Sequence, residues 1–168
     1  MSGPPSIRHA TTHDVPTILD FIRAGAAATS SLDHVEATET SLRATLNFAD
    51  SPAGHPGVAR TLLLEAPEGV VAGMAIYYYN YSTWRAKPGV ILEELFVRPE
   101  FRRRGYARRL IAELAGEVRR IGGVRVEWVC LRDNAAALQL YESLGATRME
   151  DWVTLRVSGE ALDRLAEV

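Results

Sequence analysis

The sequence is poor in the residues that build disulfide-linked and metal-bound proteins. Cys130 is the only cysteine among 168 residues, so neither an intrachain disulfide nor a cluster of cysteine ligands can form. The four histidines, His9, His13, His34 and His55, lie in the first third of the chain without the spacing of a metal site. We therefore expect no metal cofactor, and we interpret Cys130 as an inert thiol within an apolar run.

Long apolar runs and a surplus of positive charge are also absent. No stretch approaches the ~20 apolar residues of a membrane span, and the N-terminus lacks the features of a signal peptide. The formal net charge of −2 argues against nucleic-acid binding, which needs clustered surplus cations. With 47% apolar and 24% charged residues, the composition is that of a globular protein, which we expect to be cytoplasmic and away from membranes.

Hydrophobic periodicity predicts one α/β (α+β) domain over residues 1–168, with its core at about 6–157 and a C-terminal helix at 158–168. Its mixed sheet is expected to be mostly antiparallel. Strands are predicted at 7–11, 60–65, 70–79, 90–97 and 124–131, with one or two more in 147–157. Helices are predicted from about residue 13 and at 39–48, 106–121 and 135–144. Residues 81–89 are expected to form a connection.

The stretch from Ile91 to Leu110 organises the chain. An apolar strand interrupted by two carboxylates leads into a turn rich in arginine, and then into a helix. Helix N-termini present unpaired backbone N–H groups and the positive end of a dipole, and glycine lets a ligand approach the backbone. Residues 102–107 therefore suggest a pyrophosphate site, although a solvated basic turn has the same pattern.

Two motifs resemble the GNAT superfamily of N-acetyltransferases. The segment L-F-V-R-P-E-F-R-R-R-G-Y-A (Leu95–Ala107) is similar to the family's pyrophosphate loop, and N-A-A-A-L-Q-L-Y-E-S-L-G-A (Asn134–Ala146) is similar to its second cofactor segment. The resemblance implies a sheet that is split between its fourth and fifth strands to admit acetyl-CoA. The residues it assigns to this cofactor are Leu95, Phe96, Val97, Arg102, Arg103, Arg104, Gly105, Tyr106, Ala107, Arg108, Asn134, Ala137 and Tyr141.

Further segments resemble the diamine and thialysine acetyltransferase branch, namely Tyr77–Trp84, L-E-E-L-F-V and Met149–Val157. The resemblance implies a small-molecule amine substrate and a homodimer. Two departures weaken the similarity to the polyamine enzymes. Small residues at 27–31 replace a Tyr-Glu pair, and Ser82 replaces an acid, so negative charge is missing where a polycation would bind.

Acetyl transfer to an amine requires a base, because an alkylamine with a pKa of ~10.4 is only about 0.1% neutral near pH 7.4. Glu93 and Glu94 alternate along a strand, so only one is expected to face the cleft. The resemblance assigns the base to Glu93, acting directly or through water, and leaves ammonium attraction or a structural role to Glu94. Both could instead be charges of an edge strand.

Tyr141 is the candidate general acid for the departing thiolate, or a packing residue of its helix. Asn134 could bind the pantetheine arm or cap its helix. The acceptor side is expected to include Glu93, Glu94, Tyr81, Trp84, Glu127, Trp128 and Val129. Two other functions stay open: a protein or peptide acetyltransferase, and a non-catalytic sensor that binds acyl-CoA.

Overall fold

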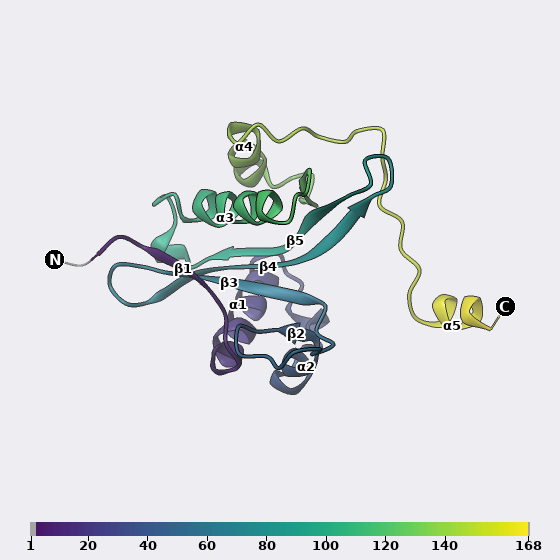
Figure 1. The fold of residues 1–168 in the computed structure, drawn as a ribbon, viewed down its shortest axis with the longest axis horizontal. Helices are drawn as coiled ribbons and strands as arrows, with labels where there is room; N and C mark the ends of the chain where they lie inside the picture. Colours follow the sequence, from purple (N-terminus) through teal and green to yellow (C-terminus); the bar gives the residue numbers. More distant parts are fainter. Residues whose placement is uncertain (1–2, 168) are drawn as a thin grey trace. The chain divides into compact units, whose positions relative to one another are not determined.

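A computed structural model describes residues 3–167, which form two compact units. The first unit extends to Leu131 and the second begins at Arg132. Figure 1 shows the elements in sequence colours. The first unit holds β1 (Ser6–His9), α1 (Val15–Ala28), α2 (Glu39–Thr45), β2 (Leu46–Asn47), β3 (Ala59–Glu65), β4 (Val71–Ser82), β5 (Lys87–Val97), α3 (Tyr106–Arg120), β6 (Val126–Trp128) and the short 3-10 helices η1 (Thr12–Asp14), η2 (Leu32–His34) and η3 (Pro99–Phe101).

The sheet of the first unit is mixed and mostly antiparallel, as predicted. Its strand order is β1-β3-β4-β5-β6, and β2 pairs with β3 outside this path. The β1–β3, β3–β4 and β4–β5 pairs are antiparallel, whereas β2–β3 and β5–β6 are parallel. The connection expected at residues 81–89 is shorter than predicted, because β4 and β5 continue as a hairpin up to Ser82 and from Lys87.

Helices cover both faces of this sheet. In Figure 1, α1 and α2 lie on one face and α3 lies on the other. The core between α1 and the sheet contains Ile18 and Phe21 from the helix, and Met74, Ile76 and Phe96 from the strands, all nearly inaccessible to solvent. The apolar stripe of α3, which includes Leu110 and Leu114, is likewise buried. β5 is therefore packed between the two helical layers.

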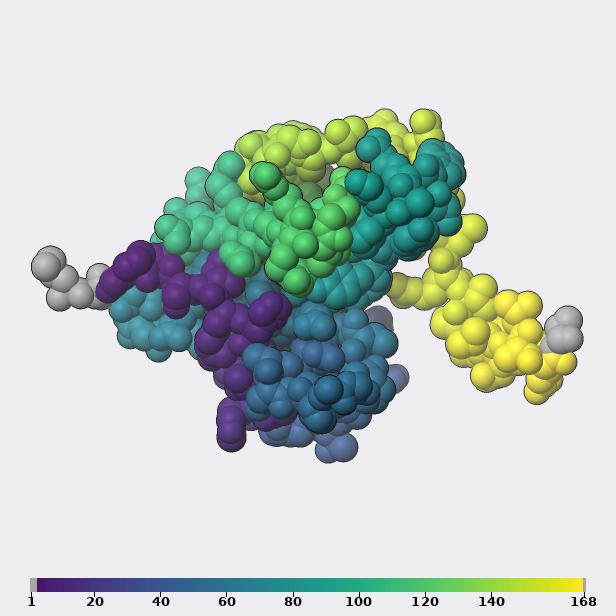
Figure 2. All heavy atoms as spheres, viewed as in Figure 1, coloured from purple at the N-terminus to yellow at the C-terminus, as the bar shows by residue number. Residues whose placement is uncertain are grey.

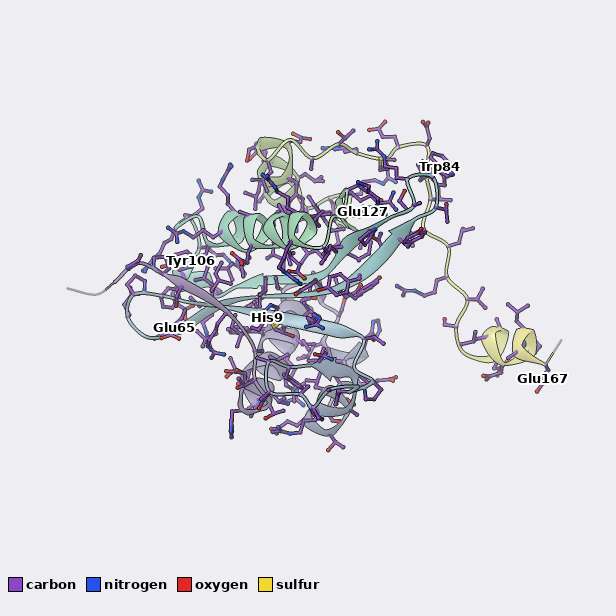
Figure 3. The ribbon with its side chains drawn as sticks, viewed as in Figure 1. His9, Glu65, Trp84, Tyr106, Glu127 and Glu167 are labelled. Atoms are coloured by element: carbon purple, nitrogen blue, oxygen red, sulfur yellow. The ribbon has the colours of Figure 1, made fainter. Side chains whose placement is uncertain are left out.

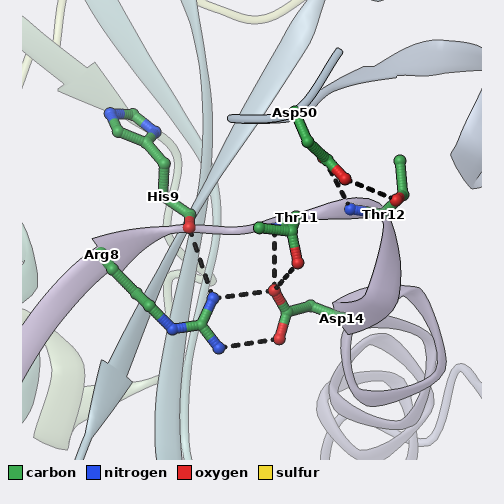
Figure 4. Close-up of polar contacts among 6 residues, drawn as sticks. All are labelled: Arg8, His9, Thr11, Thr12, Asp14 and Asp50. Carbon is green, nitrogen blue, oxygen red and sulfur yellow. Dashed lines mark hydrogen bonds and ion pairs between the residues drawn. The ribbon is translucent and has the colours of Figure 1, made fainter.

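A polar cluster fixes the start of α1, as Figure 4 shows. The Asp14 carboxylate accepts hydrogen bonds from both terminal nitrogens of Arg8 at 2.8 Å, and from the backbone N–H of Thr11 at 2.7 Å. These donors lower the pKa of Asp14 to about 2, the guanidinium of Arg8 having the largest effect. Asp50 binds the backbone N–H and the hydroxyl of Thr12 at 2.9 and 2.7 Å, which ties the following loop to the same turn.

The sheet is split beside its last strand. β5 pairs with β6 only through Val90–Leu92, opposite Val126–Trp128. Residues 93–97 continue β5 beyond the end of β6, so this edge of β5 has no neighbouring strand in the described chain. The split expected between the fourth and fifth strands is therefore present, between β5 and β6 in this numbering.

The second unit contains two helices, α4 (Ala135–Ser143) and α5 (Glu160–Ala166). Asn134 caps α4 by accepting a hydrogen bond from the backbone N–H of Ala137 at 3.1 Å. The strands predicted within 147–157 are not formed in the described chain. A strand needs a neighbour to pair with its backbone, and the second unit supplies none. No helix among residues 3–167 is long and apolar enough to cross a membrane.

Candidate functional site

A cavity of about 340 Å³ lies between the end of α1, the turn that follows it, and β5. Its volume is in the range of small-molecule sites. Apolar side chains and hydroxyl groups line most of it, and Glu94 provides the only carboxylate. The lining residues are Ile22, Gly25, Ala26, Thr29, Ser31, His34, Val35 and Glu94.

Glu94 reaches this cavity because β5 contains a β-bulge. Ile76 of β4 pairs with Glu94, but the next residue, Tyr77, pairs with Leu92, which leaves Glu93 as an extra residue in β5. The bulge places Glu94 in register with Ile76, on the face covered by α1. Glu93, in contrast, is exposed. Bulges are frequent beside active sites because they redirect side chains.

The Glu94 carboxylate is packed closely against α1. A Cβ atom added to Gly25 would lie only 2.8 Å from Oε1 of Glu94, so glycine is the residue that leaves room for this carboxylate. Burial raises the pKa of Glu94 above its ordinary value of 4.5, and the neighbouring charge of Glu93 raises it further. A half-buried carboxylate whose pKa is raised in this way is a natural binding group for an ammonium.

The loop before α3 has the backbone geometry of an anion site. Arg103 and Gly105 adopt left-handed conformations with φ of 64° and 78°, and α3 begins at Tyr106. Left-handed residues in such a turn direct successive N–H groups into a concavity, which favours a negatively charged ligand. The loop also follows directly after the unpaired edge of Leu95–Val97. These two features fit the pyrophosphate and the pantetheine arm of a coenzyme A thioester.

Two arginine side chains of this loop, those of Arg102 and Arg104, have partners within the protein. Nε of Arg102 donates to the carbonyl of Val97 at 3.0 Å, and Arg104 forms an ion pair with Glu68 at 2.9 Å. Tyr106 is buried and stacks on Phe101, so its ring serves the core. Arg103 and Arg108 are exposed, and Ala107 is partly exposed. The backbone N–H groups and the helix N-terminus are therefore groups that this loop can offer to an anion, beside the exposed Arg103 and Arg108.

A substitution tests this assignment. Gly105→Ala places a side chain at a left-handed φ in open space, which disfavours the native turn by about 1–2 kcal/mol. We expect the KM for acetyl-CoA to rise about tenfold, measured by initial rates at saturating amine. Gly116→Ala is the matched control, because Gly116 also faces open space but lies inside α3. An unchanged KM in Gly105→Ala would contradict the role of this turn.

The predicted residues Asn134, Ala137 and Tyr141 belong to the second unit. Asn134 caps α4, which was one of the two roles predicted for it. Its side chain accepts a hydrogen bond from the backbone N–H of Ala137. Tyr141 lies on α4 and is partly exposed. Their roles toward a cofactor or a thiolate stay predictions.

The remaining predicted acceptor residues do not line the cavity. Tyr81 and Trp84 are 60% and 89% exposed, and Trp84 lies at the turn of the β4–β5 hairpin (Figure 3). Glu127 of β6 accepts a hydrogen bond from Asn80 at 2.7 Å and pairs with Arg125 at 2.7 Å, so its charge is already compensated. Val129 is 79% exposed, and Trp128 is partly buried.

None of the cavity-lining residues except Glu94 was predicted from the sequence as a site residue. Gly25, Ala26, Thr29 and Ser31 all line the cavity, whereas the sequence marked only the small residues at 27–31, as the place where a polycation would bind. The available signal was the run of small residues at the end of an apolar helix, which leaves space beside a strand that carries a carboxylate.

Comparisons with known proteins agree with this geometry. Residues 28–146 match the acetyltransferase (GNAT) family. A thialysine N-epsilon-acetyltransferase of Bos taurus is 35% identical over 95% of this chain and 96% of its own. An L-ornithine N5-acetyltransferase of Arabidopsis thaliana is 32% identical over 69% of this chain and 51% of its own. An integron cassette protein of V. cholerae has the same fold, with a TM-score of 0.77, 21% identity and coverage of 100% and 99%.

Proposed function

Because this chain belongs to the GNAT family of acetyltransferases, we propose that it transfers an acetyl group from acetyl-CoA to the primary amine of a small molecule. The chain is an N-acetyltransferase, and the family's acyl donor is acetyl-CoA. The observation that carries the proposed acceptor class is the Glu94 carboxylate, which is half-buried in a cavity of small-molecule size.

The donor is held by two features of the first unit. The backbone edge of Leu95–Val97 can hydrogen-bond the pantetheine arm as an added strand would, and one of its N–H groups can polarise the thioester carbonyl. The turn at Arg103–Gly105 and the N-terminus of α3 bind the pyrophosphate. Binding along this edge brings the thioester to the split beside Glu93 and Glu94.

The acceptor is held by Glu94. Burial disfavours the ionised form of Glu94, which is why its pKa is raised. An ammonium that enters the cavity compensates the negative charge of this carboxylate, so binding is favourable. Glu93 lies at the bulge next to it and is assigned the removal of a proton from the ammonium, directly or through water. The neutral amine then attacks the carbonyl carbon of the thioester.

The later steps balance the protons. Glu93 passes the first proton to solvent. The new C–N bond then forms, the C–S bond breaks, and the nitrogen releases its second proton to the carboxylate of Glu93, or directly to water. Tyr141 is assigned the protonation of the departing thiolate, and its phenolate recovers a proton from solvent. No covalent enzyme intermediate is needed.

The lining of the cavity favours an acceptor with an amino acid end over a polyamine. His34, Thr29 and Ser31 line the cavity, and none of the described lining residues besides Glu94 is acidic. A second ammonium would find no carboxylate there, whereas a carboxylate can bind the imidazole of His34 and the hydroxyl groups. Two relatives are named as thialysine and L-ornithine acetyltransferases, and both names are consistent with an acceptor that has an amino acid end.

An acceptor panel tests the proposal. CoA release would be followed with thialysine, L-ornithine, L-lysine, putrescine, spermidine and a lysine-containing peptide. We expect kcat/KM for the best amino acid to exceed that for putrescine by at least about tenfold, the effect of one charged hydrogen bond. His34→Glu should reverse this preference, and His13→Glu, which changes an exposed histidine outside the cavity, should not. Activity on the peptide alone would overturn the small-molecule assignment.

A further inference from the structure

Gly25 is a glycine that its own helix does not require. It lies inside α1, residues 24 and 26–28 around it are alanines, and its φ lies outside the left-handed region. A helix interior favours alanine over glycine, because glycine loses more backbone freedom on folding. The reason for glycine at this position must therefore lie in what the helix packs against.

The neighbour that excludes a side chain at Gly25 is the carboxylate of Glu94. A Cβ atom at Gly25 would lie 2.8 Å from Oε1 of Glu94, closer than Cβ atoms approach other atoms in proteins, but at an ordinary 3.7 Å from the ring of Phe96. Gly25 and Glu94 also line the same cavity. In Figure 2 the N-terminal part of the chain (purple to blue) lies packed against the strands, so single atoms decide how much room remains beside β5.

Gly116 shows what a helical glycine does without such a neighbour. It lies inside α3, and a Cβ atom there would meet nothing within 4 Å. A methyl group added at Gly116 therefore changes only the helix propensity. At Gly25 the same methyl group must also displace the carboxylate of Glu94 away from α1, since this carboxylate is the flexible end of its side chain.

We propose that Gly25 and Glu94 together determine the length of acceptor side chain that the cavity accepts. The missing side chain of Gly25 lets the carboxylate lie against α1, so the acceptor's ammonium can enter further before it meets its binding group. Gly25 is thus a positioning residue that acts through Glu94. This inference rests on the proposed function, because it takes Glu94 as the group that binds the ammonium.

Two substitutions move the carboxylate in opposite directions. Gly25→Ala displaces it toward the acceptor, whereas Glu94→Asp withdraws it by one methylene group. One methylene group in a pocket changes kcat/KM by about 10- to 200-fold. We therefore expect the ratio of kcat/KM for thialysine to that for L-ornithine, whose side chain is one atom shorter, to fall about tenfold in Gly25→Ala and to rise about tenfold in Glu94→Asp. In the double variant the ratio should return to within about threefold of wild type.

Thermal unfolding gives a readout that does not depend on catalysis. Gly116→Ala is the matched control, and it should raise Tm by about 2–4 °C both in wild type and in Glu94→Asp, while the acceptor ratio stays unchanged. Gly25→Ala should raise Tm by the same amount only in combination with Glu94→Asp. In wild type the longer carboxylate has to leave its place, and this cost offsets the gain in helix propensity.

The outcomes separate this inference from the proposed function. An acceptor ratio in Gly25→Ala equal to that of wild type would overturn the inference, and so would a double variant that retains the full shift of either single variant. If wild type acetylated no amine, the proposed function would fail, and the Tm values would still test the coupling. A rise in Tm on Gly25→Ala that is equal with Glu94 and with aspartate at this position would then overturn it.

Discussion

In Glu94→Gln, we expect the KM for the amine to rise about 10- to 150-fold while the fold becomes more stable. The loss in binding follows because a charge-assisted hydrogen bond to the ammonium contributes about 1.5–3 kcal/mol. The gain in stability follows because Glu94 is half-buried and forms no ion pair within residues 3–167, whereas glutamine carries no charge into the same place. Initial rates and thermal unfolding at pH 7 would measure the two effects.

The raised pKa of Glu94 also determines how the stability of the folded protein changes with pH. The pKa of Glu94 is raised in the folded state, by burial first and by Glu93 second, so the folded protein favours the protonated form. Its contribution to stability is complete below the ordinary pKa of 4.5 and is lost as the pH rises through the raised pKa. The difference in Tm between Glu94→Gln and wild type should therefore grow from about pH 4 to pH 7 and reach roughly 1–3 °C.

Glu93→Gln is the matched control for Glu94→Gln. Glu93 is exposed, so its neutralisation should raise Tm less than that of Glu94, through the loss of its repulsion of Glu94 alone. As the assigned base, it should instead lower kcat by about 10²- to 10⁴-fold with little change in the KM for the amine. If Glu94→Gln lowered kcat and Glu93→Gln did not, the base would be Glu94, and the roles of the two carboxylates would be exchanged.

In Tyr141→Phe, we expect kcat to fall by about 10²- to 10⁴-fold while both KM values change little, because the variant loses a proton donor to the thiolate. Acyl donors with a more acidic thiol leaving group should be affected less, since their thiolates depart without protonation. Steady-state rates with acetyl-CoA and with such a donor would measure the difference.

Tyr78→Phe removes the same hydroxyl from an exposed tyrosine of β4, outside the cavity and the cofactor loop. Its kcat should equal that of wild type. A kcat within twofold of wild type in Tyr141→Phe would contradict the role of the phenol and leave Tyr141 as a packing residue of α4.

The sequence predicted the regular elements well wherever local signals were strong. α3 was expected at 106–121 and is observed at Tyr106–Arg120, because an apolar stripe and the following glycines define both its face and its end. A helix was predicted at 39–48, and Thr38 caps it, because its hydroxyl accepts a hydrogen bond from the backbone N–H of Ser41 at 3.1 Å. That helix ends at Thr45 and not at Phe48, because Leu46 turns into β2 to pair with β3.

The bulge in β5 could not be predicted, and it changed which carboxylate faces the cavity. Strict alternation allowed only one of Glu93 and Glu94 to point into the cleft, but it could not say which. The register of β4 against β5 decides this, because Glu93 is the residue without a partner. A bulge depends on pairing between two strands, so a single strand's pattern does not contain it.

Residues 153–157 show the opposite case, because their local pattern indicates a strand that the described chain does not form. Alternation of Val153, Leu155 and Val157 is sufficient to predict a strand. A strand also requires a pairing edge, and that information is not local. The cavity was missed for a related reason, since its wall comes from small residues of α1 and the next turn, whose proximity to Glu94 depends on packing.

The central claim is the transfer of an acetyl group to a small amine, and isotope transfer tests it most directly. The full chain would be incubated with acetyl-CoA labelled with ¹³C in the acetyl group and with thialysine, and the amine would be analysed by mass spectrometry. We predict the labelled acetyl group on the side-chain amine, in amounts equal to the CoA released, and strong loss of product in Tyr141→Phe. Saturable binding of the donor without label on any amine of the panel would contradict the account.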